Sequence, residues 1–241
     1  MKELKGKIAI VTGAASGIGL AIARGMIAEG MQVAMADLDL GRATHAAQPL
    51  GVQALPLAID VRDPASVEAA AQATVDRFGG INVAVNNAGI VINGVSWELT
   101  LDDWRAVLDV NLWGVVHGIR SFVPRILAAG GEGHVVNTAS IAAVFPMFGT
   151  GAYSASKHAV LGISDVLRAE LSETEVGVSV VLPGMVRTQM MPVGEDPTVV
   201  ATHVLAGIRE NLPYIYTDHF MSDEVDQRLK ALSEARSHVS T

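Results

Sequence analysis

Two residues with complementary acid–base chemistry, Tyr153 and Lys157, stand four positions apart where apolar residues recur at helical spacing. Side chains four positions apart lie on the same face of a helix. A tyrosine, with a pKa of about 10, is a weak base at neutral pH, but a neighbouring ammonium stabilises the phenolate and lowers that pKa. The pair therefore predicts a proton shuttle centred on Tyr153. The same spacing also occurs on solvated helix faces, so the position of the pair in the fold must decide.

Two further polar residues could serve the same site. Ser140 follows the apolar run 133–139, and ligands of open α/β sheets bind at the carboxyl ends of strands. Its hydroxyl could hold a substrate oxygen beside Tyr153, or it could cap a turn. Asn111 lies within the long helical pattern 101–129, where a buried amide needs hydrogen-bond partners. It is either part of the site or a satisfied core asparagine.

A glycine-rich turn, Thr12-Gly13-Ala14-Ala15-Ser16-Gly17-Ile18-Gly19, joins the first apolar run to a helical pattern. Gly13 and Gly17 let the backbone turn tightly and approach a pyrophosphate, and the helix N-terminus presents free N–H groups. The lysine and hydroxyl pair of an NTPase phosphate loop is missing. A tight strand-to-helix connection is the alternative. The cofactor contacts that we expect from this turn are Gly13, Ser16, Gly17, Ile18 and Gly19.

Asp37 ends the second apolar run, 18 residues after Gly19. A carboxylate at this offset accepts hydrogen bonds from a ribose of a dinucleotide and repels a 2′-phosphate. The next residue is Leu38 rather than an arginine, so the sequence favours NAD over NADP. Two alternatives stay open: Asp39 could take the role of Asp37, and Arg42 could fold back toward a phosphate.

The elements that must position these residues alternate along the chain. Continuously apolar runs indicate strands covered on both faces, and the helical patterns between them are long enough to be crossovers. The predicted strands are Lys7–Thr12, Met31–Asp37, Val52–Ile59, Ile81–Asn86, Gly133–Ala139, Val176–Leu182 and Tyr214–Thr217. The predicted helices are Gly17–Ala28, Pro64–Phe78, Leu101–Ala129, Ala152–Glu173, Pro197–Glu210 and about 222–236.

This alternation predicts an α/β fold, a Rossmann-type doubly wound parallel sheet of order 3-2-1-4-5-6-7 with helices on both faces. Pro56 cannot donate to a sheet ladder, so the third strand should lie at an edge. We expect one dinucleotide-binding catalytic domain over residues 1–241, with a substrate loop at about 185–197.

Composition excludes several classes of protein. The chain has 241 residues, of which 50% are hydrophobic and 17% charged, with a net charge of −8 and no cysteine. No basic stripe offers a footprint for nucleic acid, and thiolate chemistry and disulfides are excluded. The seven histidines form no convincing ligand pair, so no metal is expected. No export signal or membrane span is visible, and we expect a cytoplasmic protein.

The spacing Gly-x3-Gly-x-Gly resembles the short-chain dehydrogenase/reductase family. The resemblance extends to Asn86-Asn87-Ala88-Gly89, Asn111, Ser140, Tyr153-x3-Lys157 and Pro183-Gly184, in that order along the chain. It implies that Ser140, Tyr153 and Lys157 are catalytic, with Asn111 completing a proton relay through a water. It also implies cofactor contacts from these residues: Leu38, Asp60, Val61, Asn87, Gly89, Tyr153, Lys157, Pro183, Val186 and Thr188.

Substrate pockets of this family are lined by the loops after the fourth, fifth and sixth strands. Those loops are apolar here and carry adaptable methionines without a convergent cation. The predicted substrate contacts are Ser140, Tyr153, Val91, Ala142, Phe145, Met185 and Met190. They predict a hydrophobic alcohol or ketone, of aryl, terpenoid or steroid-like type. Core packing is the alternative for any one of the apolar residues.

The sequence therefore predicts an NAD-dependent oxidoreductase that interconverts a secondary alcohol and a ketone. An NADPH-dependent reductase of 3-oxoacyl thioesters is the first alternative, and a non-catalytic nucleotide-sensing regulator on the same fold is the second. By the same resemblance we expect a homotetramer or homodimer that pairs the helices around 101–129 and 152–173 across subunits.

Overall fold

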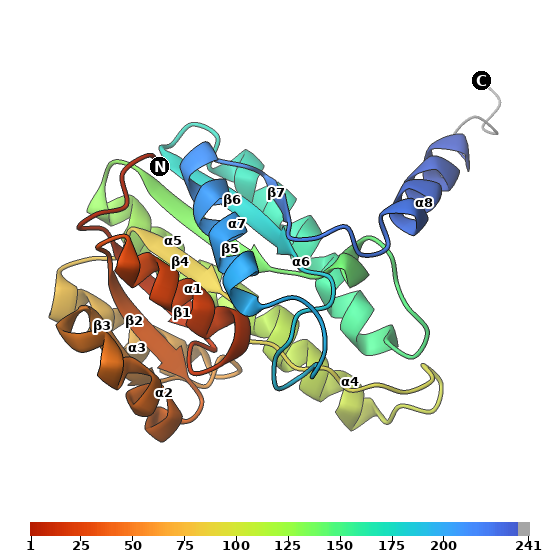
Figure 1. Ribbon diagram of the computed structural model, residues 1–241, viewed down its shortest axis with the longest axis horizontal. Helices are drawn as coiled ribbons and strands as arrows, with labels where there is room; N and C mark the ends of the chain where they lie inside the picture. Colours follow the sequence, from red (N-terminus) through yellow and green to blue (C-terminus); the bar gives the residue numbers. More distant parts are fainter. Residues whose placement is uncertain (236–241) are drawn as a thin grey trace.

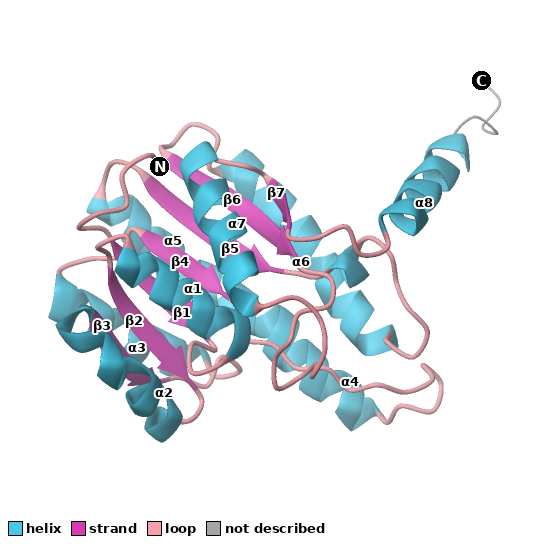
Figure 2. Cartoon of the chain, in the orientation of Figure 1, coloured by secondary structure: helices cyan, strands magenta, loops and turns pink. Residues whose placement is uncertain are grey.

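Seven short apolar strands form one parallel sheet in a computed structural model that describes residues 1–235 (Figures 1 and 2). The strand order is β3-β2-β1-β4-β5-β6-β7, and every neighbouring pair is parallel. The predicted order and fold class are confirmed. The strands are β1 (Ile8–Thr12), β2 (Gln32–Asp37), β3 (Ala54–Ala58), β4 (Val83–Asn86), β5 (Gly133–Thr138), β6 (Val176–Leu182) and β7 (Tyr214–Tyr216).

Helices cover both faces of this sheet. On one face α1 (Gly17–Ala28) and α7 (Pro197–Glu210) pack side by side, and their apolar residues share a core with alternate residues of β1 and β2. On the other face lie α3 (Pro64–Phe78), α5 (Gly114–Ala129) and α6 (Gly151–Glu170). Successive strand residues point to opposite faces, so burial on both sides requires strands that are apolar throughout.

Pro56 lies in β3, at the edge of the sheet that the sequence predicts for it. β3 pairs only with β2, and Pro56 stands opposite Met35 in that ladder. The free side of an edge strand needs no donor, so a proline is tolerated there. Asp37, the last residue of β2, pairs with Ala58 of this edge strand.

The predicted helix 101–129 is interrupted. The structure has α4 (Leu101–Leu108), a π-helical turn η2 (Asp109–Trp113) and then α5. A π-helical turn inserts one residue into the helical ladder, and such turns are frequent at functional sites. Asn111 is fully buried in this turn. A single periodic pattern cannot reveal the interruption, because the apolar residues continue through it.

Smaller differences concern short helical elements between the strands and the end of the last helix. Between β2 and β3 the structure has α2 (Leu40–Ala47) and a 3-10 turn η1 (Gln48–Gln53), which the sequence patterns do not predict. Another 3-10 turn, η3 (Ile141–Ala143), follows β5. The last helix, α8 (Ser222–Ala235), extends away from the body of the molecule (Figure 1). The predicted end of that helix at Arg236 lies outside the described residues.

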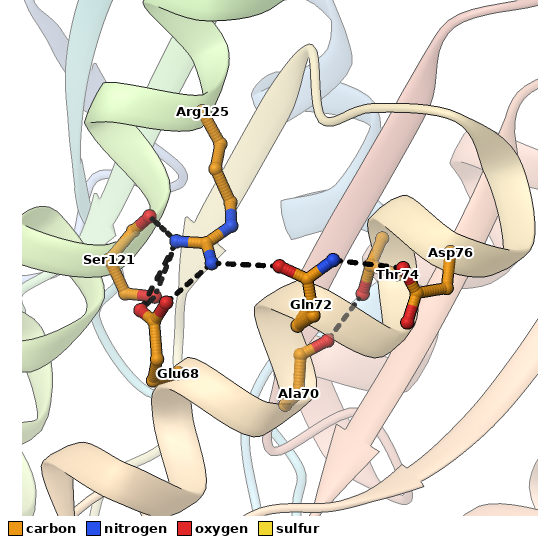
Figure 3. Close-up of polar contacts among 7 residues, drawn as sticks. All are labelled: Glu68, Ala70, Gln72, Thr74, Asp76, Ser121 and Arg125. Carbon is orange, nitrogen blue, oxygen red and sulfur yellow. Dashed lines mark hydrogen bonds and ion pairs between the residues drawn. The ribbon is translucent and has the colours of Figure 1, made fainter.

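A polar network joins α3 to α5 beneath the sheet (Figure 3). The Arg125 guanidinium donates to the Glu68 carboxylate at 2.5 and 3.1 Å, and the Ser121 hydroxyl donates to the same carboxylate at 2.8 Å. Hydrogen bonding to Arg125, and then to Ser121, lowers the pKa of Glu68. The network fixes α5, which continues from the π-helical turn that holds Asn111.

No helix within residues 1–235 is long and apolar enough to cross a membrane.

Candidate active site

A cavity of about 650 Å³ lies at the carboxyl ends of the strands, where open parallel sheets bind ligands. It is continuous from the glycine turn to the start of α6. The predicted site residues that line it are Gly13, Ser16, Gly17, Ile18, Asp37, Leu38, Asp60, Val61, Asn87, Gly89, Val91, Ser140, Tyr153, Lys157, Pro183, Met185, Val186, Thr188 and Met190. Residues from distant parts of the sequence thus share one cavity.

The glycine turn forms one end of this cavity. Gly13 and Gly17 have φ of +66° and +54°, a left-handed conformation that favours glycine. Ser16 is the N-cap of α1, and its side chain makes no capping hydrogen bond. The first hydrogen bond of the helix runs from the Leu20 N–H to the Ser16 carbonyl. The N–H groups before Leu20 therefore remain at the open end of the helix. This arrangement suits an anion such as a pyrophosphate.

Gly19, one of the predicted cofactor contacts, does not line the cavity. A Cβ at this position would lie 2.3 Å from the Gly13 carbonyl oxygen and 2.5 Å from the Asn87 amide nitrogen. The glycine therefore permits α1 to pack closely behind the turn. Its effect on a bound cofactor is through the shape of the turn.

Asp37 lies at the end of β2, beside the glycine turn. Its carboxylate accepts from the Ala15 N–H at 3.1 Å and from the Asp39 N–H at 3.3 Å. Asp39 instead caps α2 by accepting from the Arg42 N–H. The Arg42 guanidinium lines the cavity and donates to the Gln189 side-chain oxygen at 2.9 Å. Of the two carboxylates, only Asp37 lines the cavity.

Thr12 supports the next part of the wall and is a residue that sequence reasoning missed. Its hydroxyl oxygen accepts from the backbone N–H groups of Asn87 and Ala88 at 2.9 and 3.0 Å, and the Asn87 amide donates to the Thr12 carbonyl at 3.0 Å. These bonds tie the end of β1 to the loop after β4. A hydroxyl residue that ends a buried strand directly before the glycine turn was the available signal.

Asp60 is one of the cofactor contacts that the resemblance implies, and it lines the cavity. Its carboxylate is already engaged by a neighbouring side chain. The Arg62 guanidinium donates to it from Nε and Nη2, the latter at 2.6 Å. These hydrogen bonds are the main reason that the pKa of Asp60 lies below its usual range. Arg62 itself lines the cavity, so a ligand here meets an ion pair rather than a free carboxylate.

Ser140, Tyr153 and Lys157 meet at the other end of the cavity. Ser140 follows β5, where its hydroxyl accepts from the Ala142 N–H at 3.1 Å and donates to the Pro183 carbonyl at 3.4 Å. Tyr153 lies in the first turn of α6, with the Lys157 ammonium 5.6 Å from its ring centre. The pair lines a buried site and is not a solvated helix face.

The ionisation of this pair differs from the expectation. Burial raises the pKa of Tyr153, and a hydrogen bond with Ser140 opposes that change without cancelling it. Burial also lowers the pKa of Lys157 to about 8. The Lys157 ammonium donates to the Thr138 carbonyl at 2.8 Å. Desolvation is therefore the largest influence on the ionisation of both groups.

Asn111 lies behind the cavity and does not line it. Its amide accepts from the Ile90 N–H at 2.8 Å and donates to the Ile90 carbonyl at 2.9 Å and to the Ser156 hydroxyl at 3.0 Å. Ser156, also missed from the sequence, donates in turn to the Tyr153 carbonyl at 2.6 Å. Asn111 thus joins the π-helical turn to the loop after β4 and to α6.

Two predicted substrate contacts, Ala142 and Phe145, do not line the cavity. Ala142 is fully buried in η3, where its N–H donates to the Ser140 hydroxyl. Other residues of the same loops do line the cavity, among them Ile141, Met147, Thr150 and, from the C-terminal segment, Phe220. Within residues 1–235 no cluster of three or more His, Asp or Glu side chains could hold a metal ion.

Comparisons with known proteins agree with this geometry. Residues 7–197 match the family model of short chain dehydrogenases. The chain is 42% identical over 193 residues to 1-deoxy-11-beta-hydroxypentalenate dehydrogenase of Streptomyces avermitilis, with 78% of this chain and 72% of the relative covered. It is 34% identical over 206 residues to cyclohexanol dehydrogenase of Acinetobacter sp., with 83% and 81% covered.

A solved structure is similar over the whole chain. It is a short chain dehydrogenase/reductase from Burkholderia phymatum in complex with NAD, with a TM-score of 0.94 and 31% identity. The superposition covers 100% of this chain and 99% of the other.

Proposed function

The chain belongs to the short-chain dehydrogenase/reductase family, and from this premise we propose that it is an NAD-dependent oxidoreductase of hydrophobic secondary alcohols and ketones. The observation that carries the proposal is the meeting of Ser140, Tyr153 and Lys157 in the cavity that also holds the glycine turn and Asp37. One end of a ligand in this cavity would meet backbone N–H groups and a carboxylate. The other end would meet an acid–base pair beside apolar residues.

The residues of the cavity fit a dinucleotide. Gly13 and Gly17 expose backbone at the open N-terminus of α1, which suits a pyrophosphate. Asp37 supports NAD over NADP, because a carboxylate accepts from ribose hydroxyls and repels a 2′-phosphate. Leu38 adds no positive charge, and Arg42 is engaged by Gln189. The groups that would hold the nicotinamide end are Pro183, Val186 and Thr188.

In alcohol oxidation the hydroxyl proton passes to the Tyr153 phenolate oxygen. Ser140 holds the substrate oxygen beside Tyr153. Because burial raises the pKa of Tyr153, the phenolate form needs positive charge nearby, and the buried Lys157 ammonium supplies it. A bound nicotinamide supplies the acceptor for the hydride that leaves the carbinol carbon. Ketone reduction is the reverse, with the Tyr153 hydroxyl as the proton donor. No covalent intermediate with the protein is required.

The apolar walls favour a hydrophobic substrate. Val91, Met147, Met185, Met190 and Phe220 line the same cavity as Tyr153, and methionine side chains adapt to irregular apolar shapes. Relatives that are named for a hydroxylated pentalenate and for cyclohexanol support a cyclic secondary alcohol. We therefore propose an aryl, terpenoid or steroid-like substrate.

We also propose that the protein is a homodimer or homotetramer paired through α4, α5 and α6. Large apolar side chains on these helices and on the turn η2 between α4 and α5 are exposed, including Leu101 at 71%, Trp113 at 51% and Val166 at 57%. Apolar surface of this kind is commonly covered in an assembly. A mass well above 25.2 kDa in light scattering supports this pairing, and a monomer contradicts it. A cytoplasmic location stays a prediction.

A panel of cyclic, aryl and linear secondary alcohols, each with NAD and with NADP, tests the proposed function. We expect formation of NADH with the cyclic or aryl members and a lower kcat/KM with NADP. Faster reduction of 3-oxoacyl thioesters with NADPH would support the thioester reductase instead. Binding of NAD without turnover of any alcohol or ketone would support the nucleotide-sensing regulator.

A further inference from the structure

The segment between β7 and α8 packs against the loop that follows β6. The Asp218 carboxylate accepts from the Gly184 N–H at 2.9 Å and from the Phe220 N–H at 2.8 Å. A Cβ at Gly184 would lie 2.3 Å from the Asp218 carboxylate and 2.7 Å from the Phe220 Cβ. Only a residue without a side chain allows this approach. The C-terminal segment is therefore closely packed on one wall of the cavity.

Arg228, two turns into α8, contacts the segment that follows β5 and the helix α6. Its Nη1 donates to the Val144 carbonyl and to His158 Nε2, the second at 3.1 Å. His158 Nδ1 lies 2.8 Å from the Ser154 carbonyl, so Nδ1 carries the proton and Nε2 is the acceptor. The Arg228 side chain is partly buried between these two acceptors.

Both acceptors belong to segments that carry the acid–base groups. Val144 ends the turn that begins at Ser140: its N–H donates to the Ile141 carbonyl at 2.9 Å, and the Ala143 N–H donates to the Ser140 carbonyl at 2.9 Å. His158 directly follows Lys157 in α6. One guanidinium therefore connects the Ser140 turn to the helix that holds Tyr153.

We propose that Arg228 is a positioning residue for the substrate wall. By holding the Val144 carbonyl against α6, it keeps the segment 140–147 in the shape that places Ile141 and Met147 along the cavity. An arginine suits this role because the two N–H groups of its Nη1 can each donate to a separate acceptor. Arg228 does not line the cavity; it sets the affinity for the alcohol through the segment 140–147. The expected effect on KM rests on the proposed function, whereas the expected ordering of the segment 140–147 does not.

Hydrogen exchange tests the structural consequence without any substrate. Arg228→Ala should accelerate exchange at the amides of Ala143, Val144 and Phe145 by at least about fivefold and leave those of β1 and α1 unchanged. Arg228→Lys keeps a cationic donor nitrogen on a shorter side chain, so its exchange rates should fall between those of Arg228→Ala and the unaltered protein. The control is Lys230→Ala, in the same helix, where the side chain is 76% exposed and 3.8 Å from Glu234.

Steady-state kinetics test the functional consequence. With an alcohol that the unaltered enzyme oxidises, Arg228→Ala should raise KM for the alcohol about tenfold and change kcat and the Kd for NAD by less than about twofold. Lys230→Ala should change none of the three. Unchanged exchange and unchanged KM in Arg228→Ala would overturn the proposal. An equal loss of protection throughout the protein would also overturn it, because it indicates a general role in stability.

The two readouts separate this inference from the proposed function. If the unaltered protein oxidises no alcohol, the proposed function fails, while the exchange rates of residues 143–145 still decide whether Arg228 holds the segment.

Discussion

The Lys157 ammonium donates to the Thr138 carbonyl at 2.8 Å, and both groups are buried. The bond joins α6 to the end of β5 at the point where Ser140 and Tyr153 meet. A buried cation with a neutral acceptor retains much of its desolvation cost. That cost lowers the pKa of Lys157 to about 8, from an ordinary value of 10.5. The position of Lys157 is thus maintained at the expense of stability.

A stability measurement across pH tests this cost. Below pH 8 the ammonium is charged in the folded and unfolded states, and folding carries the full cost of burying it. Between pH 8 and about 10 the folded protein releases the proton first, so the free energy of unfolding should rise by about 2 kcal/mol from this group. Urea unfolding of the natural protein and of Lys157→Met, measured at each pH, isolates the effect.

The difference in free energy of unfolding between the two proteins should shift in favour of the natural one as the pH rises. Titrating groups that do not interact with Lys157 are common to both proteins and cancel in the difference. Tyr153→Phe, introduced into both proteins, removes the contribution of the neighbouring tyrosine. A difference that is the same at pH 7 and at about pH 10 would show that the pKa of Lys157 is not lowered by burial.

Removal of the Ser156 hydroxyl tests how Asn111 is held. Ser156→Ala deletes one acceptor of the Asn111 amide and the donor to the Tyr153 carbonyl, and should lower the free energy of unfolding by about 1 kcal/mol. Asn111→Leu leaves the N–H and carbonyl of Ile90 without partners and should cost about 3 kcal/mol. Because the two residues share a hydrogen bond, the double variant should cost less than the sum. Strict additivity in urea unfolding would argue against the shared bond.

Cofactor choice should depend on Asp37. Asp37→Ala removes the carboxylate that accepts from ribose hydroxyls and repels a 2′-phosphate, so the ratio of kcat/KM for NAD over NADP should fall at least about tenfold. Asp39→Ala is the matched control. It removes the cap of α2 and should lower stability by about 1 kcal/mol while leaving the ratio unchanged. If Asp39→Ala changes the ratio and Asp37→Ala does not, the ribose contact belongs to Asp39.

The sequence predicts the sheet well, because strands that are buried on both faces must be apolar throughout. Pro56 even identifies the edge strand. The helix α2 escapes prediction because its residues, with Gly41 and Arg42 among small side chains, lack a wide apolar stripe. The π-helical turn at Asn111 depends on hydrogen bonds to Ile90 and Ser156, which are distant in the sequence. Periodicity along one helix contains no information about such contacts.

The candidate site also has parts that the sequence predicts and parts that it does not. Side chains that motifs specify, such as Ser140 and Tyr153, lie where the sequence places them. Ala142 leaves the predicted pocket wall and is fully buried in a 3-10 turn. Arg228 acts on the cavity wall from α8, for which the sequence pattern indicates only a charged terminal helix. Positioning of this kind arises from tertiary packing and requires the fold.

The central claim is that Tyr153 moves the proton of the alcohol. The most direct measurement is NADH formation by Tyr153→Phe with the preferred alcohol, together with the Kd for NAD of the same protein. The account predicts that NAD binding stays within about threefold while kcat falls by at least about a thousandfold, because phenylalanine keeps the ring but has no ionisable group. Turnover within about tenfold of the natural protein would contradict it.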